Sequence, residues 1–309
     1  VAMKLLFGLP LIWGVLITAG DVIFVIYLGG NHIRVVEVIV IALIAVIATC
    51  FTIELVWSPP DFVEIVKGAL IPSPDLILDS GMLYIGIGIL GATVMPHNLY
   101  LHSSVVQTRD VQRNAPAIRE ALSMCLLDSN VALTLAFFVN GAILILAAST
   151  FYKSGHKDVA DLEQAYQMLD TVLGKQMSSV LFAVALLASG QQSTLTGTIA
   201  GQIVMEGFVQ WRLSPAVRRL VTRLAAIVPA VLVVLLAGDA AVNDLLVLSQ
   251  VVLSLQLSFA VFPLVIFTSD PDVMGEFVNA TSTKVFAWAI AWFVLVLNLF
   301  LVFQTFAGT

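Results

Sequence analysis

Two side chains that can bind a metal ion flank a proline in the middle of a long apolar stretch. Met95 offers a thioether and His97 an imidazole, and Pro96 lies between them. Transition metals accept both groups, whereas Mg²⁺ and Ca²⁺ prefer oxygen ligands. Pro96 has no amide hydrogen, and its ring clashes with the carbonyl group of Ala92, so a helix must break or kink here. The pattern predicts a metal-binding break over residues 91–98 of an apolar helix.

A broken helix exposes carbonyl oxygens at the end of its first half, and these oxygens attract cations. Ala92 is the expected carbonyl donor and Met95 the expected thioether donor. In a later apolar stretch, Gln250 carries an amide that must be hydrogen-bonded or coordinate something. Two alternatives remain open, namely that Met95 is flexible core filler and that Gln250 links two helices.

Two histidines lie in the same apolar stretch, His97 and His102. An ionisable residue inside a membrane is costly and marks a functional position, and histidine changes charge near neutral pH. The two histidines are five residues apart, so they face different sides of a helix. We predict that His97 lies on a proton path or bonds near the site, and that His102 is structural. Gly91, Pro96 and Asn98 are predicted to shape the break.

The composition is that of an integral membrane protein of the all-α class. Hydrophobic residues make up 60% of the 309 residues and charged residues 11%, against roughly 25% charged residues in soluble domains. The net charge of −6 indicates no nucleic-acid partner. No nucleophile–base pair or zinc motif with a glutamate is found, so we expect neither an enzyme nor a resident cofactor.

About eight apolar stretches are long enough to cross a lipid bilayer: residues 10–28, 34–57, 81–107, 121–150, 177–207, 215–237, 243–268 and 283–306.

The distribution of lysine and arginine predicts the orientation of these spans. One set of loops is rich in arginine and should face the cytoplasm of a multi-pass protein in the cell (inner) membrane; it contains Arg34, Arg109, Arg113, Arg119, Arg212, Arg218, Arg219 and Arg223. The opposite set contains two long loops, residues 58–80 and 151–176. Within the second loop, residues 159–173 are amphipathic and are predicted to form a short surface helix.

Residues 91–104, which read GATVMPHNLYLHSS, resemble the sixth transmembrane helix of Nramp-type, proton-coupled divalent-metal transporters. The resemblance continues through residues 188–191, 202–208, 218–220 and 248–251 and covers essentially the whole chain. It implies a LeuT-like helical bundle of the APC superfamily, present in part, from the end of helix three to helix eleven. Residues 1–309 would form a single transmembrane domain in which residues 1–57 are the remainder of the first inverted repeat, 81–268 the second inverted repeat and 283–306 an additional helix.

The resemblance also implies a role for each candidate residue. The carbonyl group of Ala92 and the thioether of Met95 would hold the metal, and Gln250 can join them. His97 matches a histidine tied to proton coupling, and Arg218 and Arg219 match arginines linked to the proton route. The implied activity is secondary active transport of Mn²⁺ or Fe²⁺, and also of Cd²⁺ and Co²⁺, coupled to protons by alternating access in a monomer. The ions would be substrates rather than cofactors.

One part of the family pattern is not found in this sequence. The Asp-Pro-Gly-Asn motif of helix one and the acidic residues of helix three are absent from residues 1–309. The remaining donors are neutral, and neutral donors offset the desolvation of a dication poorly. We therefore expect an N-terminally truncated chain whose metal uptake is low on its own. Two alternatives stay open: a non-transporting fragment, and a Mg²⁺-type carrier on the same fold, against which the thioether of Met95 argues.

Overall fold

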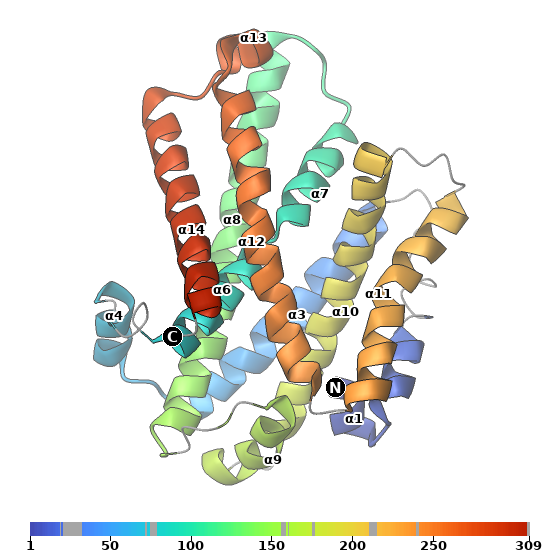
Figure 1. Ribbon diagram of the computed structural model, residues 1–309, viewed down its shortest axis with the longest axis vertical. Coiled ribbons are helices and arrows are strands. Elements are labelled where there is room, and N and C mark those ends of the chain that lie inside the picture. The colour runs from blue at the N-terminus through green and yellow to red at the C-terminus, as the bar shows by residue number, and fades with distance from the viewer. Residues whose placement is uncertain are drawn as a thin grey trace. The chain divides into compact units, whose positions relative to one another are not determined.

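The fold is described from a computed structural model of residues 1–309, shown as a ribbon in Figure 1. The structure describes all residues except 19, 21–32, 72, 75–78, 156–158, 160, 175–176, 210–214, 239–240 and 308–309. The described residues form helices joined by turns and loops, and these residues contain no strand. The all-α class expected from the composition is therefore confirmed.

The chain divides into two compact units, each described here by itself. The first unit comprises Val1–Ala69 and Ser104–Ala241. Its helices are α1 (Ala2–Phe7), α3 (Ile33–Trp57), α8 (Ala115–Ala147), the π-helix η1 (Ala148–Tyr152), α9 (Leu162–Leu173), α10 (Ser178–Val204), the π-helix η2 (Met205–Val209) and α11 (Pro215–Ala237). Helix α3 packs against both α8 and α10. The shared core consists of Ile47, Cys50, Phe51, Leu146, Ala185 and Ala188.

The second unit comprises Leu70–Ser103 and Val242–Thr309. Its elements are α6 (Ser80–Thr93), the first part of α7 (Pro96–Gln107), α12 (Ala241–Ser269), α13 (Pro271–Met274), the 3₁₀ helix η3 (Gly275–Phe277) and α14 (Thr281–Ala307). Its buried core joins α6, α12 and α14 through Leu83, Ile87, Val251 and Leu301. Farther along α12 and α14, the ring of Phe262 meets Trp288 and Trp292 edge-on, with centroids 5.5 and 5.4 Å away.

Five helical segments of the described residues are long and apolar enough to cross a membrane: Arg34–Trp57, Ser80–Gln107, Ala115–Tyr152, Ala241–Ser269 and Thr281–Phe303. They correspond to five of the eight spans predicted from the sequence. The predicted spans 177–207 and 215–237 are also helical, as α10 with η2 and as α11, but these helices are not among the five. In the predicted span 10–28, residues 11–18 and 20 are helical, and residues 19 and 21–28 lie outside the described residues.

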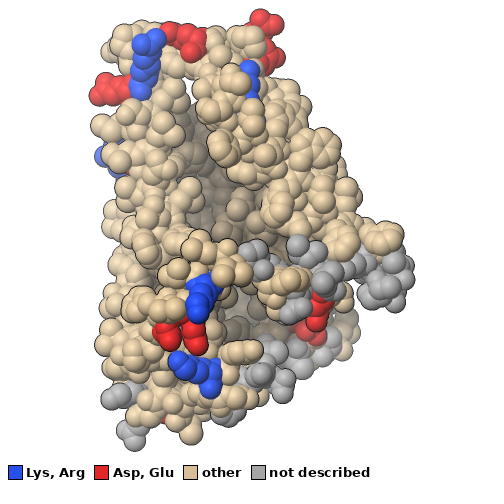
Figure 2. Space-filling view, turned by 90° about the vertical axis from the view of Figure 1, so that its left-hand side faces the viewer, with Lys and Arg blue, Asp and Glu red and all other residues tan. Residues whose placement is uncertain are grey.

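Large apolar side chains lie exposed along the long helices. On α8, for example, Phe137 is 71% and Phe138 is 66% exposed, and uncharged side chains dominate the face drawn in Figure 2. Soluble monomers rarely expose large continuous apolar patches, so the exposed side chains suit contact with lipid. The expected membrane environment agrees with this surface.

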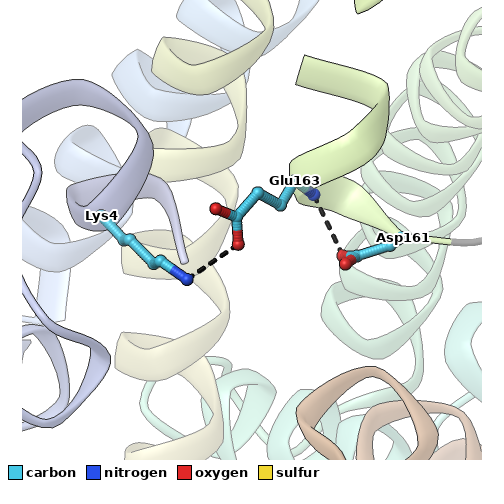
Figure 3. A network of polar contacts seen from close by, with 3 residues as sticks. All are labelled: Lys4, Asp161 and Glu163. Atoms are coloured by element: carbon cyan, nitrogen blue, oxygen red, sulfur yellow. Dashed lines mark hydrogen bonds and ion pairs between the residues drawn. The ribbon is translucent and has the colours of Figure 1, made fainter. Parts of the chain in front are cut away.

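The two long loops predicted from the sequence both contain a helix. Residues 58–80 include α4 (Phe62–Leu70), which the sequence analysis did not predict. The surface helix predicted at 159–173 is confirmed as α9, and the side chain of Asp161 caps it by accepting a hydrogen bond from the amide of Glu163. Lys4 of α1 donates to the Glu163 carboxylate at 2.8 Å and so ties α9 to α1 (Figure 3).

The two compact units do not coincide with the predicted inverted repeats. The first unit combines residues on both sides of α6, and the second joins α6 to the C-terminal helices. The division into repeats at 1–57 and 81–268, and the single domain over 1–309, therefore stay predictions.

Candidate functional site

The predicted helix break lies between α6 and α7, which Figure 1 draws as two separate helices. Helix α6 ends at Thr93, and Val94 leaves the helical conformation with φ −115° and ψ 83°. The amide of Val94 still donates to the carbonyl oxygen of Leu90 at 2.9 Å. The next helix begins at Pro96, and the amide of Asn98 closes its first turn on Met95 at 3.1 Å. The break predicted over 91–98 is thus confirmed, and it consists of Val94 and Met95.

Pro96 determines which carbonyl group the break sets free. In an unbroken helix, the carbonyl group of Ala92 would accept a hydrogen bond from the amide four residues later. That residue is Pro96, which has no amide hydrogen. Ala92 itself is small and exposed, and Met95 is half-buried. A carbonyl oxygen that needs a partner and a thioether therefore lie three residues apart at one turn.

Helix α6 meets α12 backbone to backbone immediately before the break. A Cβ atom placed on Gly91 would collide with the carbonyl oxygen of Gln250, and would lie 2.9 Å from both the carbonyl carbon of Gln250 and the amide nitrogen of Ser254. At Gly88, one turn earlier, an added Cβ would lie 3.6 Å from side-chain atoms of Val247 and Val251. Only glycine allows so close an approach. The structure therefore places Gly91, next to Ala92, against the backbone of Gln250.

The side chain of Gln250 has an unused acceptor. Its Nε2 atom lies 3.3 Å from the hydroxyl of Ser249, and its Oε1 atom is buried with no hydrogen-bond partner among the described residues. A buried acceptor left without a donor costs about 1–3 kcal/mol. A bound cation would satisfy this oxygen. No three His, Cys, Asp or Glu side chains converge in the described part of the chain, so the donors gathered here are neutral.

Two residues that the sequence analysis did not single out fix α12 at this crossing. Asn298 of α14 donates through Nδ2 to the carbonyl oxygen of Ser254 at 3.0 Å, and the Ser254 hydroxyl donates back to its Oδ1 atom at 3.1 Å. Asn298 is 1% exposed and Ser254 is 0% exposed. The amide nitrogen of Ser254 is the same atom that borders Gly91. An asparagine in an otherwise apolar helix was the available indication, because a buried amide requires a partner.

The remaining predicted residues take different places. Pro96 is buried, His97 is half-buried in the first turn of α7, and Asn98 and His102 are exposed farther along this helix. Arg218 and Arg219 lie in α11, in the first unit, and the structure describes their backbone but not their side chains. The structure therefore brings Gly91 against the backbone of Gln250, while the metal ligands and the proton route stay predictions.

Comparisons with known proteins bear on the family and the fold of the chain. Residues 1–304 match the family described as Natural resistance-associated macrophage protein-like, or Nramp. The chain is 56% identical over 305 residues to a Listeria monocytogenes protein named divalent metal cation transporter MntH, and the alignment covers 99% of this chain and 68% of the relative. A relative of the same name from Nostoc is 52% identical over 308 residues, with 100% and 70% covered.

The fold is similar to that of a solved manganese transporter from Eremococcus coleocola, determined in complex with an aromatic bis-isothiourea substituted compound. The TM-score is 0.84 and the sequence identity 37%, and the match covers 99% of this chain and 67% of that one. A match of this extent shows a shared architecture for the described helices.

Proposed function

We propose that this chain, which belongs to the Nramp family, binds divalent transition-metal ions at the break between α6 and α7 and carries them across a membrane. One observation supports this proposal most directly: at Gly91 the break lies against Gln250, whose side-chain oxygen is buried without a partner. The names of the relatives, divalent metal cation transporter and manganese transporter, support the same substrate class.

The proposed ligands are the carbonyl oxygen of Ala92, the thioether of Met95 and the amide oxygen of Gln250. Oxygen donors suit Mn²⁺ and Fe²⁺, and the sulfur favours these ions, Co²⁺ and Cd²⁺ over Ca²⁺ and Mg²⁺. The metal is the transported substrate, and the proposal includes no resident cofactor. A break in a membrane helix can form a site open to either side in turn, as alternating access requires.

Coupling to protons is a further part of the proposal. Half-buried His97 is two residues from Met95, so a change in its charge would act on a metal ion held there. Arg218 and Arg219 are proposed to belong to the same proton route in α11. We propose that the protein acts as a monomer in the cell (inner) membrane, with the metal ion, the proton and the lipid bilayer as its partners.

The thioether provides the sharpest test of the site. In Met95→Ala, Cd²⁺ binding should weaken about tenfold, or ~1.4 kcal/mol, and Mn²⁺ binding should weaken less, because Cd²⁺ gains more from sulfur. Ca²⁺ and Mg²⁺ should enter more easily. The matched control is Met82→Ala, since Met82 lies in α6, which ends at the break, and is 46% exposed. Calorimetric titration and liposome uptake measure these effects; equal losses for all ions would show that Met95 only fills space.

Two further measurements separate the remaining readings. If His97 lies on the proton path, metal uptake by His97→Ala should lose its pH dependence, whereas an unchanged pH profile removes this residue from the path.

Liposomes that contain only residues 1–309 should show low Mn²⁺ uptake, because the donors gathered at the break are neutral. Uptake as fast as that of the Listeria relative would contradict this expectation, and a preference for Mg²⁺ would favour the Mg²⁺-type carrier.

A further inference from the structure

Glu54, near the end of α3 in the first unit, is an acid sealed inside the protein. Its side chain is 0% exposed, and neither carboxyl oxygen has a hydrogen-bond partner among the described residues. An ionised carboxylate in such surroundings is very costly unless it is paired. The group must therefore be neutral or be compensated by a ligand.

The packing seals this carboxyl group from water. Because Glu54 is 0% exposed, no water-sized space touches its side chain, and a water molecule needs both space and two to four polar partners. One turn earlier, Cys50 is 5% exposed and belongs to the apolar core that joins α3, α8 and α10. A proton is the one ligand that requires no additional volume.

Three hydroxyl groups just beyond this end of α3 bond to one another rather than to Glu54. Ser58, one turn after Glu54, accepts a hydrogen bond from Thr150 at 3.2 Å and shares one with Ser149 at 3.0 Å. The hydroxyl of Ser149 donates in turn to the carbonyl oxygen of Leu146 at 3.2 Å. The three protons therefore run along one chain from Thr150 through Ser58 to Ser149. None of them is left for the Glu54 carboxyl group.

No described cation faces Glu54 from the elements packed around it. Helix α10 contains no Asp, Glu, Lys, Arg or His, and the titratable residue of η1 is Tyr152, which is 63% exposed. The charged residues of α8 (Arg119, Glu120 and Asp128) lie in its first half, away from η1. On α3 itself, the charged residues besides Glu54 are Arg34 and Glu37, at the opposite end. Ion pairing therefore does not explain this burial.

We propose that Glu54 is a proton-binding site, whose carboxyl group is held as a neutral acid while α3, η1 and α10 are packed and releases its proton only when these elements separate. A neutral acid has an O–H group that can donate to a backbone carbonyl oxygen, whereas a carboxylate can only accept. The neighbouring π-helix η1 fits this role, because single-turn π-helices occur frequently at functional sites. The site needs no metal, so it stands apart from the proposed transport function.

The proposal fixes the sign of a pH effect. The packed state binds one more proton than a state in which water reaches Glu54, so the packed state is favoured at low pH and loses stability as the pH rises. The melting temperature of the protein in detergent should therefore fall as the pH rises from about 4, where a water-exposed glutamate ionises, and level off once the packed group itself ionises. Glu54→Gln, the closest uncharged analogue of the acid, should fold normally and show a smaller fall. Equal pH dependence in both proteins would overturn the proposal.

Infrared spectroscopy tests the protonation state directly. The purified protein at neutral pH should show the carbonyl band of a protonated carboxylic acid, and Glu54→Gln should lose that band. The matched control is Glu64→Gln in α4, since Glu64 is exposed, and this change should leave the band in place. A band that persists in Glu54→Gln would overturn the proposal. A second outcome would also overturn the proposal: Glu54→Gln aggregates at neutral pH while Glu64→Gln folds normally. That result would show that a charge is needed at Glu54.

Discussion

Among the described residues, Gln250 and Glu54 each bury a side-chain oxygen without a hydrogen-bond partner, and their surroundings differ. Gln250 of α12 lies at a helix crossing against Gly91, immediately before the break that contains half-buried Met95. Glu54 of α3 lies in an unbroken helix and is sealed by apolar neighbours. The first oxygen is neutral and has further donors close by. The second belongs to an acid and has none among the described residues.

The difference shows how an unsatisfied buried oxygen can be interpreted. Where a broken backbone offers additional donors and an approach from solvent, the oxygen suits a cation that arrives and leaves. Where no space and no donor exist, the ligand that fits is a proton already attached to the group. The two sites therefore predict opposite responses: variants at the break should change metal binding, and variants at Glu54 should change the dependence on pH.

The largest effect is expected for Gly91→Ala. The added methyl group would collide with the Gln250 carbonyl group and force α6 away from α12. Overpacking of this kind costs about 1–3 kcal/mol, and Cd²⁺ affinity should fall by more than tenfold because the donors separate. The control is Gly141→Ala in α8, where an added Cβ meets nothing within 4 Å. Thermal melting and calorimetry measure both quantities; unchanged metal affinity in Gly91→Ala would show that the crossing does not form the site.

A smaller loss is expected for Asn298→Leu. This change removes both hydrogen bonds to Ser254 and leaves a buried hydroxyl group without a partner, at a cost of about 1–3 kcal/mol. Metal affinity should fall several-fold, since α12 can then turn Gln250 away from the break. Adding Ser254→Ala removes the unpaired hydroxyl and should restore part of the stability but not the affinity. Simple additivity of the two changes in stability would contradict this coupling.

Substitution by leucine compares the two buried side chains, Gln250 and Glu54. Gln250→Leu should raise the stability of the protein by about 1 kcal/mol, because it removes a buried acceptor without a partner, and should weaken metal binding. Glu54→Leu should also leave the neutral-pH stability intact but should not alter the affinity for Cd²⁺. Chemical unfolding and metal titration of both variants provide the measurement. If both variants lose metal affinity equally, the distinction between the two sites is wrong.

The smallest effect is expected for the ion pair that joins α1 to α9. The side chains of Lys4 and Glu163 are 27% and 38% exposed, and exposed pairs contribute about 0.2–1 kcal/mol. Lys4→Ala should therefore shift the melting temperature slightly, and less so at high salt, with no change in metal affinity. A loss of metal affinity would show that α9 influences the site.

The sequence predicted those features of the site that depend on local chemistry. Pro96 determines where the helix breaks, and with it which carbonyl group is freed, because a missing amide hydrogen acts four residues back along the same chain. The crossing of Gly91 on Gln250 joins segments more than 150 residues apart, and long-range packing of this kind has no local pattern. The all-α class followed from composition alone.

The features that the sequence analysis missed also have physical reasons. Helix α4 lies between Pro60 and Pro72, and the prolines of that loop masked a short amphipathic segment. Glu54 stands three residues before the end of α3, where an acid is typical of a side chain that reaches water. That acid is buried where α3 packs against α8 and α10, which are distant in the sequence. Asn298 was overlooked for the same reason, since its partner Ser254 lies in another helix.

The central claim is that the break holds a metal ion through Met95, and X-ray absorption of bound Cd²⁺ tests it most directly. The account predicts a sulfur neighbour in the first coordination shell of the parent protein and of Met82→Ala, and its loss in Met95→Ala. A shell made only of oxygen and nitrogen in the parent protein, or sulfur scattering that survives in Met95→Ala, would contradict the account.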